Sequence, residues 1–233
     1  MIDVQHITKE FKGYRGLNDV SFSVPKGQVF CLIGANGAGK STTIKILTNQ
    51  ITPTSGTATI AGVNVSECFN QIKPDIAYVP ENLMLYGHLS GIQNLDFFCN
   101  ISGLTYSEDE LKSYLSQVGL DQKFFQKKLE NYSKGMKQKV GIAFALAKKA
   151  KVLFLDEPTS GLDPKSIAEF SGLIKALKDN GMTILMTSHD LFRTINDADN
   201  IGIMREGNLL EIVDAKQITF AGLEKKYMDY MND

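Results

Sequence analysis

Residues 29–42 read Val29-Phe30-Cys31-Leu32-Ile33-Gly34-Ala35-Asn36-Gly37-Ala38-Gly39-Lys40-Ser41-Thr42. The first five are apolar throughout, the pattern of a strand that is buried on both faces. Residues 41–48, which follow the glycines, have the length of a short helix. A strand, a glycine-rich turn and a helix in this order begin a βαβ unit, so the sequence predicts an α/β fold built on a mostly parallel sheet.

The same segment fits the spacing G-x-x-x-x-G-K-[ST] from Gly34 to Ser41. Glycines let backbone N–H groups turn inward around a polyphosphate, and the dipole of the following helix favours the same anion. Lys40 then places an ammonium on the β and γ phosphates, while the Ser41 hydroxyl binds Mg²⁺. The alternative is a glycine turn beside an unrelated lysine, which the strand before it and the helix after it disfavour.

Strand and helix patterns alternate along most of the chain. Further strands are expected at 2–7, 20–24, 57–61, 76–79, 152–155, 183–187, 201–204 and 209–213, the last two forming a hairpin. Between about residues 83 and 131 the pattern is helical, with capping boxes starting at Ser90 and Ser107. We therefore expect one domain over residues 1–233, with a core at 1–82 and 132–233 and an inserted helical lobe at about 83–131.

Composition limits the classes of partner. The net charge of −1 over 233 residues provides no positive field for nucleic acid. The three cysteines form no C-x-x-C pair, which indicates a reducing compartment and no zinc site. The amino terminus has no signal-peptide pattern, and the longest apolar run, residues 142–147, is far shorter than the ~18 residues that span a bilayer. Any role at a membrane would need a partner protein.

Two carboxylates follow the apolar run at 152–155. Asp156 is expected at the carboxyl edge of the sheet, where α/β proteins bind ligands, and would hold Mg²⁺ directly or through water. Glu157 points elsewhere and would orient or deprotonate an attacking water. An Asp-Glu pair alone is more often a helix cap or a solvated pair, but the preceding phosphate loop reverses that preference.

With these motifs in order, the chain resembles the nucleotide-binding subunit of ATP-binding-cassette (ABC) transporters over nearly its whole length. Tyr132-Ser133-Lys134-Gly135-Met136 resembles the Leu-Ser-Gly-Gly-Gln signature of that family, and Ser160-Gly161-Leu162-Asp163 is similar to its dimer-contacting loop. Thr187-Ser188-His189-Asp190 resembles its switch-histidine segment. Phe11 stands where the family stacks an aromatic ring on adenine, with Tyr14 as the other candidate.

The chain departs from the family pattern in two places. Lys134 and Met136 replace the usual glycine and glutamine of the signature, although Ser133 and Gly135 remain. Glu81 replaces a glutamine that contacts Mg²⁺ and couples to the membrane subunit. A carboxylate is also a hard oxygen ligand, so magnesium binding is expected to survive. Both departures resemble those of the drug and peptide exporter branch.

The resemblance implies a P-loop NTPase core of the RecA type, an antiparallel β subdomain, and ATP and Mg²⁺ as cofactors. It implies that two subunits, alike or distinct, meet head to tail. Each ATP then lies between one phosphate loop (Gly34, Ala35, Asn36, Gly37, Ala38, Gly39, Lys40, Ser41, Thr42) and the partner's Ser133 and Gly135, with Asp163 at the interface. The implied catalytic residues are Lys40, Glu157 and His189, and the implied metal contacts are Ser41, Glu81 and Asp156.

The function expected from the resemblance is ATP hydrolysis that drives an exporter of drugs, peptides or lipids. The chain would sit on the cytoplasmic face of the cell membrane, bound to a separate transmembrane permease, and residues 83–86 are candidates for that contact. One alternative is a soluble clamp acting on ribosomes or DNA, but such chains usually carry two cassettes or a long coiled coil. The other is a regulatory subunit that binds ATP without hydrolysing it, which intact Lys40, Asp156, Glu157 and His189 disfavour.

Overall fold

The computed structural model describes residues 1–232 and contains two β-sheets. The strands are β1 (Ile2–Phe11), β2 (Tyr14–Val24), β3 (Val29–Ile33), β4 (Ser55–Ile60), β5 (Val63–Asn64), β6 (Ile76–Val79), β7 (Val152–Leu155), β8 (Thr183–Ser188), β9 (Asn200–Arg205) and β10 (Asn208–Asp214). The helices are α1 (Lys40–Leu47), α2 (Val65–Ile72), α3 (Gly91–Ile101), α4 (Glu108–Gln117), α5 (Lys134–Ala147), α6 (Pro164–Asp179), α7 (Leu191–Asp197) and α8 (Phe220–Asn232).

The larger sheet has the strand order β10-β9-β3-β8-β7-β6, and only the β9–β10 hairpin is antiparallel. β3 lies inside this sheet, and all five of its side chains are buried. The smaller sheet, β2-β1-β4-β5, is antiparallel. The predicted α/β class, with a mostly parallel sheet and an antiparallel β unit, is therefore confirmed.

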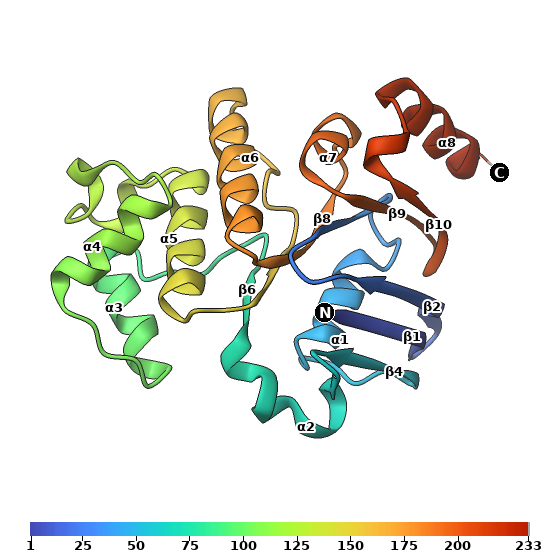
Figure 1. Ribbon diagram of the computed structural model, residues 1–233, viewed down its shortest axis with the longest axis horizontal. Helices are drawn as coiled ribbons and strands as arrows, with labels where there is room; N and C mark the ends of the chain where they lie inside the picture. Colours follow the sequence, from blue (N-terminus) through green and yellow to red (C-terminus); the bar gives the residue numbers. More distant parts are fainter. Residues whose placement is uncertain (233) are drawn as a thin grey trace.

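Alternation along the central strands divides the core into two parts. Phe30 and Leu32 of β3 face a cluster shared with α1 and the antiparallel sheet. Cys31 and Ile33 face the opposite cluster, which includes side chains of α5 and α6. Figure 1 shows this arrangement, with α6 and α7 above the larger sheet and β1, β2 and β4 below it. β3 is thus covered on both sides, as its apolar sequence predicts.

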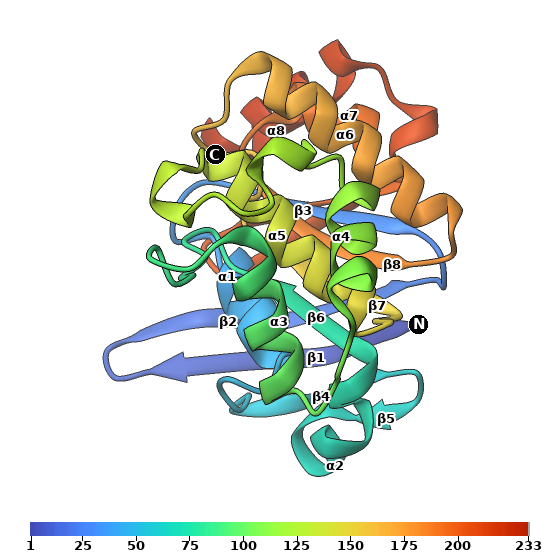
Figure 2. The ribbon, with the colours of Figure 1, turned by 90° about the vertical axis from the view of Figure 1, so that its left-hand side faces the viewer.

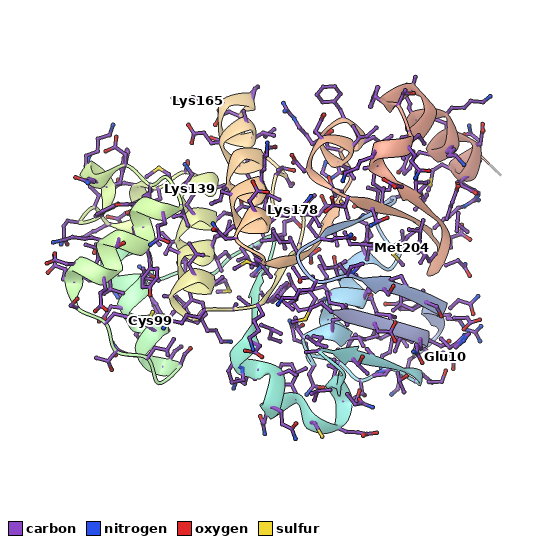
Figure 3. The ribbon with its side chains drawn as sticks, in the orientation of Figure 1. Glu10, Cys99, Lys139, Lys165, Lys178 and Met204 are labelled. Carbon is purple, nitrogen blue, oxygen red and sulfur yellow. The ribbon has the colours of Figure 1, made fainter. Side chains whose placement is uncertain are left out.

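The helices α3, α4 and α5 lie at the left-hand end of the molecule in Figure 1 and face the viewer in Figure 2. Both predicted capping boxes are present, at Ser90 and at Ser107. Cys99 is buried among these helices, and in Figure 3 it lies at the opposite end from Met204, which packs beside the antiparallel sheet. None of the helices within residues 1–232 is long and apolar enough to cross a membrane.

The hairpin of β1 and β2 and the helix α2 are among the elements that differ from the sequence prediction. β1 continues to Phe11 and β2 already begins at Tyr14, so they form one long hairpin. Its register shifts along β1, with His6 and Asp19 at positive φ, which disrupts the strict alternation that marks a strand in sequence. The short helix α2 was not predicted because a non-helical residue, Cys68, interrupts it.

Packing of the α3–α4 region gives a stability prediction. Leu115 on α4 is fully buried, so Leu115→Ala should lower the free energy of unfolding by about 2–5 kcal/mol. Ile101→Ala, at a side chain that is 65% exposed, is the matched control and should change stability by less than about 1 kcal/mol. Urea unfolding of the three proteins measures both values. Equal stability of the two variants would contradict this packing.

Candidate functional site

The carboxyl ends of four neighbouring parallel strands meet at one edge of the larger sheet. β3 leads into Gly34, β6 into the loop with Glu81, β7 into Asp156, and β8 into His189. The register pairs Ile33 with Ser188, and Val79 with Leu155. Functional groups that are far apart in sequence are therefore delivered to the same place, which is where open α/β sheets bind ligands.

Glycine is required at both ends of the phosphate loop. A Cβ on Gly34 would lie 2.3 Å from the carbonyl oxygen of Met204. Gly39 has φ +102°, and a Cβ there would lie 2.6 Å from the Leu17 side chain. α1 begins directly after Gly39 without a side-chain cap, so its first N–H groups remain available to an anion. The backbone is thus shaped as the motif predicts.

Lys40 lies folded over this loop and is 5% exposed. Its Nζ donates hydrogen bonds to the carbonyl oxygens of Gly34 (2.6 Å) and Ala35 (3.2 Å). The same ammonium lies 3.4 Å from Oε1 of Glu157. A buried cation with these contacts places a fixed positive charge at the centre of the loop, where the charge on a phosphate would be stabilised most strongly.

Asp156 is held by two hydroxyl groups that donate to the same carboxylate oxygen. Ser41 Oγ lies 2.9 Å from Oδ1, and Thr187 Oγ1 lies 2.7 Å from it. Burial, with Asp156 alongside, raises the pKa of Tyr78 to about 12, so this phenol stays protonated at neutral pH. The carboxylate is accordingly surrounded by protonated donors.

The residues present fit a magnesium ion. Ser41 and Asp156 supply hard oxygen donors next to the phosphate loop, which is the ligand chemistry that Mg²⁺ prefers. Within the part of the chain that the structure describes, no three or more His, Cys, Asp or Glu side chains form a metal cluster. A site with few protein ligands agrees with the usual mode of Mg²⁺, which keeps waters and substrate phosphates as its other ligands.

Glu157 and His189 contact each other at the same edge of the sheet. Glu157 Oε2 and His189 Nδ1 are 2.8 Å apart. Glu157 has φ +45°, an uncommon conformation for a residue other than glycine, and its N–H donates to Thr187 Oγ1 at 2.8 Å. This strained backbone turns the Glu157 side chain away from that of Asp156, so the two adjacent carboxylates contact different residues, His189 and Ser41.

A cleft of about 190 Å³ opens over the phosphate loop. Its lining consists of Tyr14, Gly16, residues 35–42, Glu81 and Glu157. Phe11 is not among these residues; its ring stacks on that of Tyr14, with the ring centroids 5.1 Å apart. Tyr14 therefore lines the cleft and Phe11 lies next to it, and a role for either ring with adenine stays a prediction.

The remaining predicted residues lie outside the cleft. Ser133 caps α5 by accepting the N–H of Met136, and a Cβ on Gly135 would lie 3.5 Å from the Leu162 side chain. Asp163 caps α6, and its hydrogen bond from the Ser166 hydroxyl lowers its pKa below the usual range. A single chain therefore does not bring these residues to its own phosphate loop.

Thr187 belongs to the same arrangement, although the sequence analysis does not assign it a role. It is fully buried and its hydroxyl joins the two carboxylate residues, donating to Asp156 and accepting from the Glu157 backbone. The signal was a hydroxyl residue at the end of an apolar strand, next to the predicted His189. This signal is weak, because threonine also occurs at the ends of strands for its β propensity alone.

Comparison with known proteins agrees with this geometry. The family model described as "ABC transporter" matches residues 17–160. The lantibiotic transport ATP-binding protein SrtF of Streptococcus pyogenes is 38% identical over 90% of this chain and 89% of its own length. The bacitracin transport ATP-binding protein BcrA of Enterococcus faecalis is 35% identical over 94% and 70%. A solved ATP-binding subunit of an ABC transporter is 28% identical with a TM-score of 0.83, covering 98% of this chain and 99% of its own.

The position of Thr187 generates a kinetic prediction. Thr187→Val keeps the side-chain volume but removes the hydrogen bonds of the hydroxyl with Asp156 and with the Glu157 N–H, so the two carboxylate residues are no longer held by one group. We expect kcat for ATP to fall about 10-fold, by loss of positioning. Steady-state ATPase assays measure this effect. Thr187→Ser, which retains the hydroxyl, should recover most of the rate; a serine variant as slow as the valine variant would exclude the hydrogen-bond explanation.

Proposed function

Because this chain belongs to the ABC transporter family as its ATP-binding, ATP-hydrolysing subunit, we propose that it powers the export of a drug or peptide through a separate permease. The observation that carries the proposal is the gathering of Lys40, Asp156 and Glu157 at one edge of the sheet. Lys40, a cation for phosphate, and Glu157, a carboxylate for water, then line one cleft, and Asp156, an oxygen ligand for the metal, lies against Ser41 of the same cleft.

The phosphate loop and α1 would bind the triphosphate of Mg-ATP. Backbone N–H groups of residues 34–42 would donate to the phosphate oxygens, and Lys40 would exchange its two carbonyl partners for the β and γ phosphates. Ser41 and Asp156 would hold Mg²⁺, which neutralises phosphate charge when bound. Glu81 lines the same cleft and is the third candidate for a metal contact.

Glu157 would orient the attacking water and accept its proton as the water oxygen bonds to the γ phosphorus. The bond between that phosphorus and the bridging oxygen of ADP then breaks, releasing ADP and phosphate. His189, which is 2.8 Å from Glu157, would contact the γ phosphate and keep the carboxylate oriented. Most of the rate acceleration in such reactions comes from positioning and electrostatics, which the hydrogen bonds around Asp156 and Glu157 favour.

The separation of Ser133, Gly135 and Asp163 from the cleft supports a site completed between two subunits. Ser133 and Gly135 lie at the amino end of α5, where a hydroxyl and a bare backbone suit contact with a phosphate. In a head-to-tail dimer these residues would reach the partner's nucleotide, and Asp163 would face the partner across the interface. The dimer is either homomeric or formed with a similar chain.

A contact with the permease is supported by apolar side chains near Glu81. Met84 is 88% exposed and Tyr86 is 44% exposed, and the Tyr86 ring packs edge-on against Phe97 of α3. An exposed apolar group of this kind fits a short helix of a membrane subunit. We therefore propose a peripheral location on the cytoplasmic face of the membrane, with residues 83–131 as the docking lobe and residues 1–82 and 132–233 as the ATPase core.

The cargo is proposed from the relatives. SrtF and BcrA are named for the transport of a lantibiotic and of bacitracin, and we propose a cargo of the same class for this chain. The soluble clamp and the regulatory subunit are disfavoured, because the relatives are transport proteins and because Glu157 and His189 contact each other as a hydrolytic pair would.

Substitution of Glu157 tests the proposal. Glu157→Gln should still bind ATP, since Lys40 and the loop amides are unchanged, but should hydrolyse it about 10²- to 10⁴-fold more slowly because the base is lost. ATP binding and phosphate release, measured on the purified protein, separate the two effects. Glu224→Gln, at an exposed position on α8, is the control and should match the wild type.

The same variant tests the cargo class. In cells, replacing the wild-type chain by the Glu157→Gln variant should lower resistance to bacitracin or to a lantibiotic. Wild-type hydrolysis by the variant would refute the role of Glu157. Slow hydrolysis with unchanged resistance to both peptides would refute the cargo class alone.

A further inference from the structure

Two of the three residues at which the chain departs from its family pattern lie against each other. Glu81 Oε1 is 3.9 Å from Lys134 Nζ, and we call this pair the Glu81–Lys134 contact. The same carboxylate oxygen accepts a hydrogen bond from Ser160 Oγ at 3.3 Å. Glu81 belongs to the loop after β6, Lys134 is the first residue of α5, and Ser160 follows β7. One carboxylate thus joins three segments at the edge of the cleft.

The contact lies on the face of α5 that presses against this loop. Lys134, Gln138 and Gly141 are spaced i, i+4 and i+7, so they share one side of the helix. A Cβ on Gly141 would lie 2.8 Å from the Leu83 side chain and 3.3 Å from that of Val79. α5 therefore packs closely against residues 79–83 at Gly141. Lys134 lies at the amino-terminal end of the same face, next to Ser133.

Between Lys134 and Gly141, the side-chain amide of Gln138 lacks hydrogen-bond partners among the residues that the structure describes. Gln138 is 1% exposed, yet neither its amide nitrogen nor its amide oxygen has a hydrogen-bond partner in the described residues. A buried unpaired amide is unfavourable, so an arrangement that gives Gln138 a partner would compete with the present one. Within residues 1–232, the Glu81–Lys134 contact is the only ion pair between the loop at 80–86 and α5.

The contact is suited to being formed and broken. The Lys134 side chain is 33% exposed and the Glu81 side chain is 44% exposed. Ion pairs of this exposure contribute little to the stability of a fold. A small bias is enough to shift an equilibrium between two arrangements of similar free energy. Glu81 also lines the cleft, so the contact links the edge of the cleft to the start of α5.

We propose that Lys134 is a positioning residue: through the Glu81–Lys134 contact it holds the first turn of α5, and with it Ser133 and Gly135, against the loop after β6. Glu81 and Lys134 then act as a pair of opposite charges that links the two segments. The consequence for ATP turnover rests on the proposed function, in which Ser133 and Gly135 serve the partner's nucleotide. The contact itself does not depend on that function.

Hydrogen exchange tests the contact without nucleotide. The variants are Glu81→Gln, Lys134→Gln, the double variant and Lys134→Arg, with Lys137→Gln as the control on the same helix. Each single glutamine variant should speed amide exchange in the peptide 132–142 about two- to five-fold, and the double variant should equal the singles. Lys134→Arg and Lys137→Gln should exchange like the wild type. Unchanged exchange in the single variants, or effects that add in the double variant, would overturn the proposal.

ATPase kinetics separate positioning from simple loosening of the helix. Lys134→Gln should lower kcat about two- to five-fold with the KM for ATP unchanged, because the phosphate loop that binds ATP in cis is untouched. Lys134→Arg should restore kcat, and an effect confined to KM would contradict a positioning role. If the wild-type chain itself shows no turnover, the proposed function fails, whereas the exchange experiment still decides the Glu81–Lys134 contact.

Discussion

The convergence of backbone N–H groups at the start of α1 is the constraint on which the other features depend. It requires a strand that cannot move and a turn that no side chain obstructs. β3 supplies the first, since all of its side chains are buried between two packed layers. Gly34 and Gly39 supply the second, because a side chain at either position would collide with neighbouring backbone or with Leu17. The anion site is therefore a product of the core as much as of the loop.

Opposite charges around this loop are held in a fixed arrangement. Lys40 lies between two carbonyl oxygens and the carboxylate of Glu157, and Asp156 is held by Ser41 and Thr187. Glu157 in turn contacts His189. Asp156, Glu157 and His189 directly follow parallel strands of one sheet, which gives them the fixed relative positions that electrostatic catalysis requires. The groups proposed to act on the partner's nucleotide lie on α5 and α6 instead.

Local sequence patterns were sufficient for much of this description. The apolar runs at β3 and β7, the glycine spacing and the capping boxes at Ser90 and Ser107 act over a few residues, and the structure confirms them. The α/β class and membership of the ABC ATPases are confirmed as well. The roles of individual site residues and the lobe boundaries stay predictions.

Features that depend on tertiary contacts could not be derived in this way. The bulged hairpin of β1 and β2 lacks strict alternation, and the stacking of Phe11 on Tyr14 depends on that hairpin. Thr187 gains its importance only from Asp156 and Glu157, which are about 30 positions away in sequence. The same holds for Glu81 and Lys134, which as separate residues looked like two unrelated departures and in space form one contact.

ATP turnover by a Lys40→Ala variant tests the central claim most directly, with Lys45→Ala, at an exposed position of the same helix, as the control. The account predicts that Lys40→Ala abolishes measurable hydrolysis, because the fixed cation at the centre of the loop is lost, and that Lys45→Ala hydrolyses ATP like the wild type. Hydrolysis at the wild-type rate by Lys40→Ala would contradict the account.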